Sequence, residues 1–166
     1  MRKAIHRFKY QRDIGLGMIF AEFLYALCQA QTWNIEMVVP VPLSKARIKQ
    51  RGYNQAAMIA YPLALALGRP YCNKALFRIR ETRSQVGLSI QERFLNVENA
   101  FAASKPAITG KSILLIDDVT TTGSTLHACA SALFSQEAKR VYCLTLARAQ
   151  DRMGKNSNTP DVLEPV

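Results

Sequence analysis

The segment that most constrains the fold is residues 113–126, Ile-Leu-Leu-Ile-Asp-Asp-Val-Thr-Thr-Thr-Gly-Ser-Thr-Leu. Its first four residues are apolar and predict a buried central strand that ends before the two carboxylates. Helical spacing from Leu126 onward predicts that the Thr/Gly/Ser loop opens a helix. Ligands of open α/β sheets bind at the carboxyl ends of strands. The segment therefore predicts an α/β fold with a ligand site at this loop.

The chemistry of the loop indicates a sugar phosphate as the ligand. A helix start offers unpaired backbone N–H groups and partial positive charge to an anion. Asp117 and Asp118 can instead accept hydrogen bonds from hydroxyls and hold Mg²⁺ through water. We therefore expect phosphate at one end of the site and a diol at the other. The candidate phosphate-binding residues are Thr120, Thr121, Thr122, Gly123, Ser124 and Thr125.

Other uses of this pattern fit less well. A P-loop requires Gly, four residues and Gly-Lys-Ser/Thr, which the chain lacks. A two-component receiver requires a phosphoacceptor Asp and a Lys on later strands, and only residues 141–146 are predicted to form a strand after the loop. The remaining structural alternative is an Asp-Asp pair that merely caps a helix.

The segment resembles the 5-phosphoribosyl-1-diphosphate (PRPP) motif of type I phosphoribosyltransferases. Further segments narrow the resemblance to the ComF/GntX family, a phosphoribosyltransferase-like group associated with DNA uptake and natural competence. They are residues 39–43 (Val-Pro-Val-Pro-Leu), residues 51–55 (Arg-Gly-Tyr-Asn-Gln) and residues 83–88 with Arg93, Phe94 and Asn96. The resemblance implies a type I phosphoribosyltransferase-like α/β domain over residues 1–149. Its central, mainly parallel sheet is expected to be flanked by helices and to carry a small hood.

Periodicity along the chain predicts the alternation that such a fold needs. The predicted helices are residues 14–31 (amphipathic), 54–67, 91–97 and 124–134. The predicted strands are residues 37–41, 71–79, 100–103, 113–116 and 141–146. Residues 80–89 are predicted to form a loop, and the polar residues 150–166 are expected to be a disordered tail.

Composition agrees with one compact domain, because 49% of the 166 residues are apolar and 20% are charged. No run reaches the roughly 18 apolar residues of a membrane span. The start lacks a signal-peptide pattern, so we expect a cytoplasmic protein without membrane insertion. The widely spaced Cys28, Cys72, Cys129 and Cys143 are expected to be reduced core thiols. Relatives of this kind usually carry a four-cysteine zinc module, which is missing here, so no zinc site is expected.

The resemblance also implies where the diphosphate would bind. In phosphoribosyltransferases the loop after the first core strand contacts pyrophosphate through backbone amides, which points to Leu43, Ser44 and Lys45. An edge strand with a stiff exit turn is an equal alternative for this proline-containing segment. Arg51 is the strongest single candidate, because its guanidinium matches phosphate oxygens. Arg83 would lie on a flexible loop that closes over PRPP and excludes water.

For phosphoribosyl transfer, the candidate catalytic residues are Asp117, Asp118, Arg51 and Arg83. Mg²⁺ on the diphosphate, held through water by the two carboxylates, would stabilise the leaving pyrophosphate together with the basic groups. Thr121 stands where purine-salvage enzymes carry an acidic base, which argues against a purine acceptor. The motif predicts ligand binding and leaves transfer itself open.

The charge distribution favours a nucleic-acid partner as well. The net charge is +10, and five cations, Arg2, Lys3, Arg7, Lys9 and Arg12, lie near the start. PRPP, itself a polyanion, would fit the same charge. Two hypotheses follow: an active Mg²⁺-dependent phosphoribosyltransferase, or a single-stranded-DNA-handling protein with DNA-processing partners and a retained or vestigial phosphoribosyl pocket. The nearby aromatics Phe8, Tyr10, Phe20, Phe23 and Tyr25 are expected to pack in the core or hood.

Overall fold

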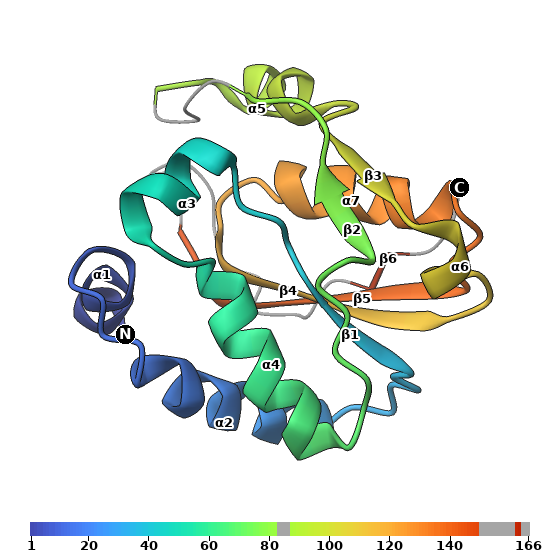
Figure 1. Cartoon of the computed structure of the whole chain (residues 1–166), viewed down its shortest axis with the longest axis horizontal. Coiled ribbons are helices and arrows are strands. Elements are labelled where there is room, and N and C mark those ends of the chain that lie inside the picture. The colour runs from blue at the N-terminus through green and yellow to red at the C-terminus, as the bar shows by residue number, and fades with distance from the viewer. Residues whose placement is uncertain (83–86, 150–161, 164–166) are drawn as a thin grey trace.

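The protein folds around a mainly parallel sheet with β4 (Ser112–Thr120) at its centre (Figure 1). The computed structural model describes residues 1–82, 87–149 and 162–163. β4 pairs in parallel with β1 (Met37–Pro40) on one side and β5 (Arg140–Arg148) on the other. β6 (Val162–Leu163) adds an antiparallel pairing to β5. The predicted α/β fold with a mainly parallel sheet flanked by helices is confirmed.

Both faces of this sheet are covered, which explains the uninterrupted apolar run of β4. Leu114 and Ile116 face a core shared with α2 (Leu16–Gln29) and α4 (Gln55–Leu67). Ile113 and Leu115 face the opposite core, against α7 (Ser124–Phe134). All four side chains are fully buried. Alternate residues of one strand therefore belong to the two cores that fix the sheet between its helices.

A smaller layer lies beyond α7. β2 (Leu76–Arg78) and β3 (Phe101–Ala103) form an antiparallel pair, and α5 (Ile90–Val97) and α6 (Lys105–Ile108) flank β3 in the chain. Ser89 and Glu92 form a capping box that begins α5. The predicted strand over residues 71–79 is shorter than expected, because a turn follows the isolated bridge between Tyr71 and Val38.

Besides the four-residue α6, two longer helices were not predicted as such: α1 (Arg2–Tyr10) and α3 (Lys45–Arg51). Both are short and strongly basic, so neither shows an extended apolar stripe. Tertiary packing defines α1, and a local turn defines the end of α3. Ile5 and Phe8 anchor α1 in the core, and Gly52, at φ +85°, ends α3 in the left-handed conformation.

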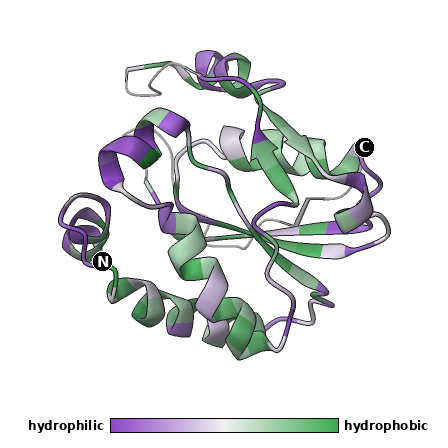
Figure 2. Ribbon diagram, viewed as in Figure 1, coloured by the Kyte–Doolittle hydropathy of each residue, from purple (hydrophilic) through white to green (hydrophobic). Residues whose placement is uncertain are grey.

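The prediction that the helix after residue 14 is amphipathic is wrong. α2 buries Phe20 and Leu24, but Met18 (65%), Phe23 (56%) and Leu27 (50%) are exposed on its outer side. Figure 2 shows α2 coloured mostly hydrophobic, whereas α1 and α3 are coloured mostly hydrophilic. Phe23 is therefore not the core residue it was expected to be. Within the described ranges, no helix is long and apolar enough to cross a membrane.

The cysteines behave as core residues. Cys28, Cys129 and Cys143 are buried, and Cys72 is half-buried against one core. Burial raises the pKa of Cys28 to about 11 and also raises that of Cys129. These two thiols are therefore protonated at neutral pH and unsuited to nucleophilic or metal-binding roles.

Candidate functional site

A cavity of about 510 Å³ opens where β1 and β4 end. Its walls come from six segments: α1, the β1–α3 loop with α3, the start of α4, the end of β2 with the residues that follow it, the end of β4, and the start of α7. The lining includes Lys9, Tyr10, Leu43, Ser44, Arg47, Arg51, Gln55, Arg78, Thr82, Asp117, Asp118 and Thr125. The structure thus brings the predicted acidic pair and the predicted Arg51 into one site.

The acidic pair lies inside β4 and not after it. The predicted end of the strand at residue 116 is wrong, because β5 continues to pair from Asp117 through Thr120. Asp118 is only 8% exposed. Its backbone N–H donates to Oδ1 of Asp117 at 2.8 Å. The continuing ladder therefore fixes the backbone of both carboxylates without help from a ligand.

Burial and the neighbouring Asp118 raise the pKa of Asp117 to about 7. The Asp117 carboxyl is therefore only about half ionised at pH 7. A cation or a set of hydroxyl donors in the cavity would stabilise the carboxylate and favour loss of this proton. The acidic pair is suited to a ligand that brings Mg²⁺ or hydroxyls with it.

Replacing Asp117 by asparagine is expected to stabilise the ligand-free protein at pH 8. Between pH 3.8, the ordinary value, and about 7, the folded protein holds a proton that the unfolded chain has lost, so stability falls as pH rises. Asparagine does not ionise and can keep the bond from the Asp118 N–H. We expect a melting temperature about 5 °C higher than wild type at pH 8, or roughly 2 kcal/mol, with no difference below pH 4. Thermal melts in EDTA would check this, and equal stability at pH 8 would contradict it.

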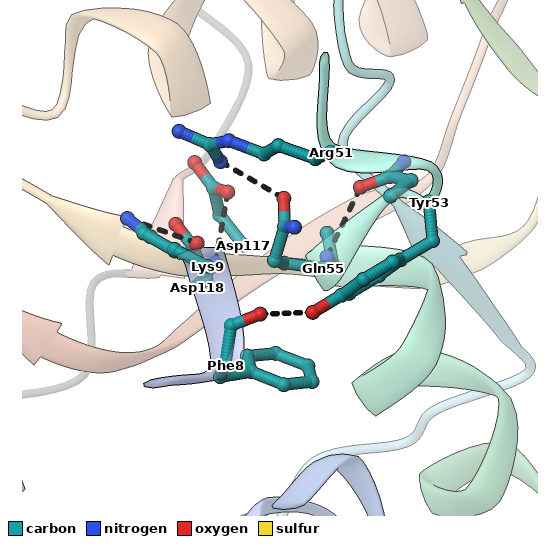
Figure 3. A network of polar contacts seen from close by, with 9 residues as sticks. Phe8, Lys9, Arg51, Tyr53, Gln55, Asp117 and Asp118 are labelled. Atoms are coloured by element: carbon teal, nitrogen blue, oxygen red, sulfur yellow. Dashed lines mark hydrogen bonds and ion pairs between the residues drawn. The ribbon is translucent and has the colours of Figure 1, made fainter. Parts of the chain in front are cut away.

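Lys9 is the counter-ion of the acidic pair. Its Nζ lies 2.9 Å from Oδ2 of Asp118 (Figure 3), and the two side chains are only 19% and 11% exposed. The sequence placed Lys9 among the cations of a nucleic-acid strip, so its position in this site was missed. Its position four residues after the buried Ile5 is the signal that could have found it, because residues i and i+4 lie on the same face of a helix.

Phe8 holds α1 over the cavity. Its ring is fully buried, with centroids 5.3 Å from Phe20 and 5.9 Å from Tyr53. The Tyr53 hydroxyl donates to the Phe8 carbonyl. α1 therefore covers one side of the cavity. Tyr10, by contrast, is 57% exposed at the rim of the site, so it does not pack in the core, which was one of the two places expected for it.

Arg51 and Gln55 offer unused donors to the cavity. Arg51 Nη1 donates to Gln55 Oε1 at 2.9 Å (Figure 3). The Arg51 guanidinium also lies 5.3 Å from the centre of the Tyr10 ring. Arg51 Nε and Gln55 Nε2 are buried and have no partner within the described part of the chain. Buried donors of this kind are normally paired. The arrangement fits a ligand rich in acceptor oxygens. Gln55 was missed as a site residue although it ends the Arg-Gly-Tyr-Asn-Gln segment that begins with Arg51.

The β1–α3 loop holds the three residues whose backbone amides were expected to contact the diphosphate, Leu43, Ser44 and Lys45. Leu43 and Ser44 line the cavity, and Ser44 caps α3 by accepting from Arg47 N–H at 3.3 Å. The Lys45 N–H instead donates to the Glu81 carboxylate at 3.1 Å. The Glu81 carboxylate therefore already accepts the hydrogen bond of the Lys45 amide, which was expected to bind pyrophosphate. β1 is also the end strand of the main sheet apart from the bridge to Tyr71, as the edge-strand alternative expected.

The Thr/Gly/Ser loop connects β4 to α7, and α7 begins at Ser124 as predicted. Gly123 adopts φ +84°, and the Thr122 and Ser124 hydroxyls lie 3.1 Å apart. Thr125 lines the cavity, whereas Ser124 lines a second cavity between α5 and α7. The lining found for the first cavity does not include Thr120, Thr121, Thr122 or Gly123. Their role in phosphate binding stays a prediction.

The expected lid begins at the cavity rim. Thr82 lines the cavity and accepts from the guanidinium of Arg78. Burial lowers the pKa of Arg78, a cation of the wall that the sequence did not single out. Arg83, the candidate lid residue, lies outside the described residues, so its predicted role stays a prediction.

The donor set fits hydrated Mg²⁺ that arrives with a diphosphate. Among the described residues, no cluster of three or more His, Cys, Asp or Glu side chains could hold a metal ion. Mg²⁺ commonly binds through one or two carboxylates, waters and substrate phosphates. Asp117 and Asp118 can supply the carboxylate part of such a shell.

Comparison with known proteins agrees with this geometry. The pattern of the phosphoribosyl transferase domain family matches residues 52–164. Competence protein F of Haemophilus influenzae is 36% identical over 152 residues, which are 87% of this chain and 66% of that protein. The DNA utilization protein YhgH of Escherichia coli is 33% identical over 147 residues, 84% of this chain and 64% of that protein. The chain therefore spans about two thirds of the length of these relatives.

Solved structures agree on the fold. Adenine phosphoribosyltransferase from Saccharomyces cerevisiae superposes with a TM-score of 0.52 at 18% identity, over 84% of this chain and 72% of that one.

Proposed function

Because this chain belongs to the phosphoribosyl transferase domain family, we propose that its cavity binds PRPP or a related phosphoribosyl ligand together with Mg²⁺. One observation carries the proposal: two carboxylates and two buried donors without a partner among the described residues converge on the same cavity. We place this activity in a cytoplasmic protein of the ComF kind that acts in DNA uptake. The name of the Haemophilus influenzae relative supports that role.

Each end of the ligand has a counterpart in the cavity. Asp117 and Asp118 accept hydrogen bonds from the ribose hydroxyls and hold water molecules of the metal. Arg51 and Gln55 donate to diphosphate oxygens, with the β1–α3 loop beside them. Residues 120–125 receive the 5-phosphate at the start of α7. Mg²⁺ supplies charge neutralisation of the diphosphate when it is bound.

Phosphoribosyl transfer is the reaction that this arrangement supports. The bond between the anomeric carbon and the pyrophosphate oxygen breaks, and the electron pair leaves with pyrophosphate, onto which Arg51 donates. A nucleophile of the acceptor then bonds to the same carbon. The acidic pair lies where positive charge develops on the sugar. The non-catalytic alternative uses the same contacts for binding alone.

A thermal-shift comparison of ligand fragments tests the proposal. PRPP with Mg²⁺ at a hundred times its dissociation constant is expected to stabilise the protein by about 2.7 kcal/mol. Ribose 5-phosphate and pyrophosphate, each with Mg²⁺, are expected to stabilise it less, because each occupies one end of the cavity. No stabilisation by PRPP would count against the proposal.

Single-stranded DNA handling is the second candidate function, and the exposed cations of α1 favour it. Arg2, Lys3 and Arg7 are exposed on a helix that carries no acidic residue. The name of the Escherichia coli relative refers to DNA utilization. Cationic strips of this kind bind phosphate backbones without regard to sequence.

Changing Arg2, Lys3 and Arg7 to alanine is expected to weaken single-stranded DNA binding and to flatten its salt dependence. Loss of three phosphate contacts reduces the slope of log K against log salt by about 2. The matched control replaces Lys105, Lys111 and Lys139, which lie on the exposed surface near the amino ends of β4 and β5. Fluorescence anisotropy across a salt series would check this. Equal slopes for both variants would remove α1 from the DNA surface.

A further inference from the structure

We propose that single-stranded DNA bound along α1 and α3 crosses the mouth of the phosphoribosyl cavity, so that DNA and the phosphoribosyl ligand exclude one another. The inference rests on the proposed function of the cavity and adds the relation between its two ligands. It follows from where the cations lie, from which of them line the cavity, and from the charge that each ligand brings.

The two most basic helices of the protein meet at this mouth. α1 exposes Arg2, Lys3 and Arg7, and α3 exposes Lys45, Arg47 and Lys49. The helices contact one another where the Arg51 guanidinium lies over the Tyr10 ring. Figure 2 shows both helices as hydrophilic segments. A single DNA strand that contacts the cations of both helices must pass over the Tyr10–Arg51 contact.

That contact is also part of the cavity wall. Lys9 and Tyr10 line the cavity from α1, and Arg47 and Arg51 line it from α3. The Tyr10 ring is more than half exposed. Proteins that bind single strands combine a cationic track with aromatic rings that contact the bases. The same rim therefore offers single-stranded DNA both kinds of contact. DNA bound there blocks the entrance of the cavity to the phosphoribosyl ligand.

The charge balance gives the sign of the coupling. A phosphomonoester carries about −1.5 to −2 charges at pH 7, and a diphosphate adds at least as much. The Mg²⁺ complex of PRPP therefore keeps a net charge of roughly −2. Occupation of Asp118 would release Lys9 from its ion pair, which returns at most one positive charge to the rim. The filled cavity is thus less attractive to a polyanion than the empty one.

Exclusion has a quantitative signature. The apparent dissociation constant for DNA rises in proportion to ligand concentration and reaches no plateau, whereas weaker coupling between compatible sites gives a plateau. Linkage requires the reverse effect to be equally strong, so DNA must weaken binding of the phosphoribosyl ligand.

The test is fluorescence anisotropy of a labelled oligothymidylate at constant ionic strength and constant free Mg²⁺, titrated at increasing PRPP. We expect the apparent dissociation constant to rise about 100-fold at a PRPP concentration 100 times its own dissociation constant. An Asp117→Asn, Asp118→Asn variant is expected to bind the oligonucleotide with an apparent dissociation constant that rises at most about twofold at the same PRPP concentration. Sulfate at matched ionic strength is expected to have no effect beyond that of salt.

Calorimetric titration with PRPP and Mg²⁺, in the absence of DNA, separates the possible failures. Unchanged or tighter oligonucleotide binding while calorimetry shows PRPP bound would overturn the inference and leave the proposed function standing. A plateau in the titration, or no oligonucleotide binding at all, would overturn it as well. Absence of PRPP binding would remove the proposed function and this inference together.

Discussion

A protein carrying both Asp117→Asn and Asp118→Asn is expected to bind Mg²⁺ and PRPP at least about 100-fold more weakly than wild type. Hydrogen bonds to charged groups contribute about 1.5–3 kcal/mol each, and 1.4 kcal/mol corresponds to a factor of ten. Losing two such bonds, together with the metal's water-mediated contacts, accounts for the expected size. Calorimetric titration of both proteins would measure it.

The double variant is expected to stay folded, because the asparagine at 117 can still accept from the Asp118 N–H. Thermal melts provide that check. A matched control changes Glu98 and Glu137 to glutamine, which removes the same charge at exposed positions outside the cavity. Equal affinity of the acidic-pair variant and the control variant would take Asp117 and Asp118 out of the binding site.

Replacing Phe8 by alanine is expected to produce the largest loss of stability, about 3–5 kcal/mol. The ring is fully buried between Phe20 and Tyr53. It also holds α1 in the position from which Lys9 reaches Asp118. The same substitution should therefore weaken ligand binding as well as folding.

Urea unfolding would check this prediction. Phe23→Ala is the matched control, since Phe23 is 56% exposed on α2. Surface substitutions of this kind usually change stability by less than about 0.5 kcal/mol. Similar losses for the two variants would contradict the role of Phe8 as the anchor of α1.

The central part of the fold could be predicted from the sequence because its signals are local. The apolar run at residues 113–116 is buried on both faces of the sheet, and α7 spans Ser124–Phe134 as its spacing predicted. Asp117, Asp118 and Arg51 were expected in one site because their segments resemble a known family. Their meeting in one cavity agrees with that expectation.

The rest of the site depends on tertiary contacts that no local pattern contains. The end of β4 is set by its pairing with β5, so the strand extends past the predicted boundary. The polar α1 packs through Ile5 and Phe8, and only this packing brings Lys9 to Asp118. Gln55 becomes a site residue because the arrangement of α3 and α4 leaves its Nε2 buried, with no hydrogen-bond partner in the part of the chain that the structure describes.

Calorimetric titration of the wild-type protein with PRPP, with and without Mg²⁺, tests the central claim most directly. The account predicts binding of one PRPP per chain that becomes much tighter when Mg²⁺ is present. It also predicts proton release on binding near pH 7, because the bound cation and hydroxyls favour the ionised form of Asp117, whose pKa is about 7. Absence of binding, or an affinity independent of Mg²⁺, would contradict the account.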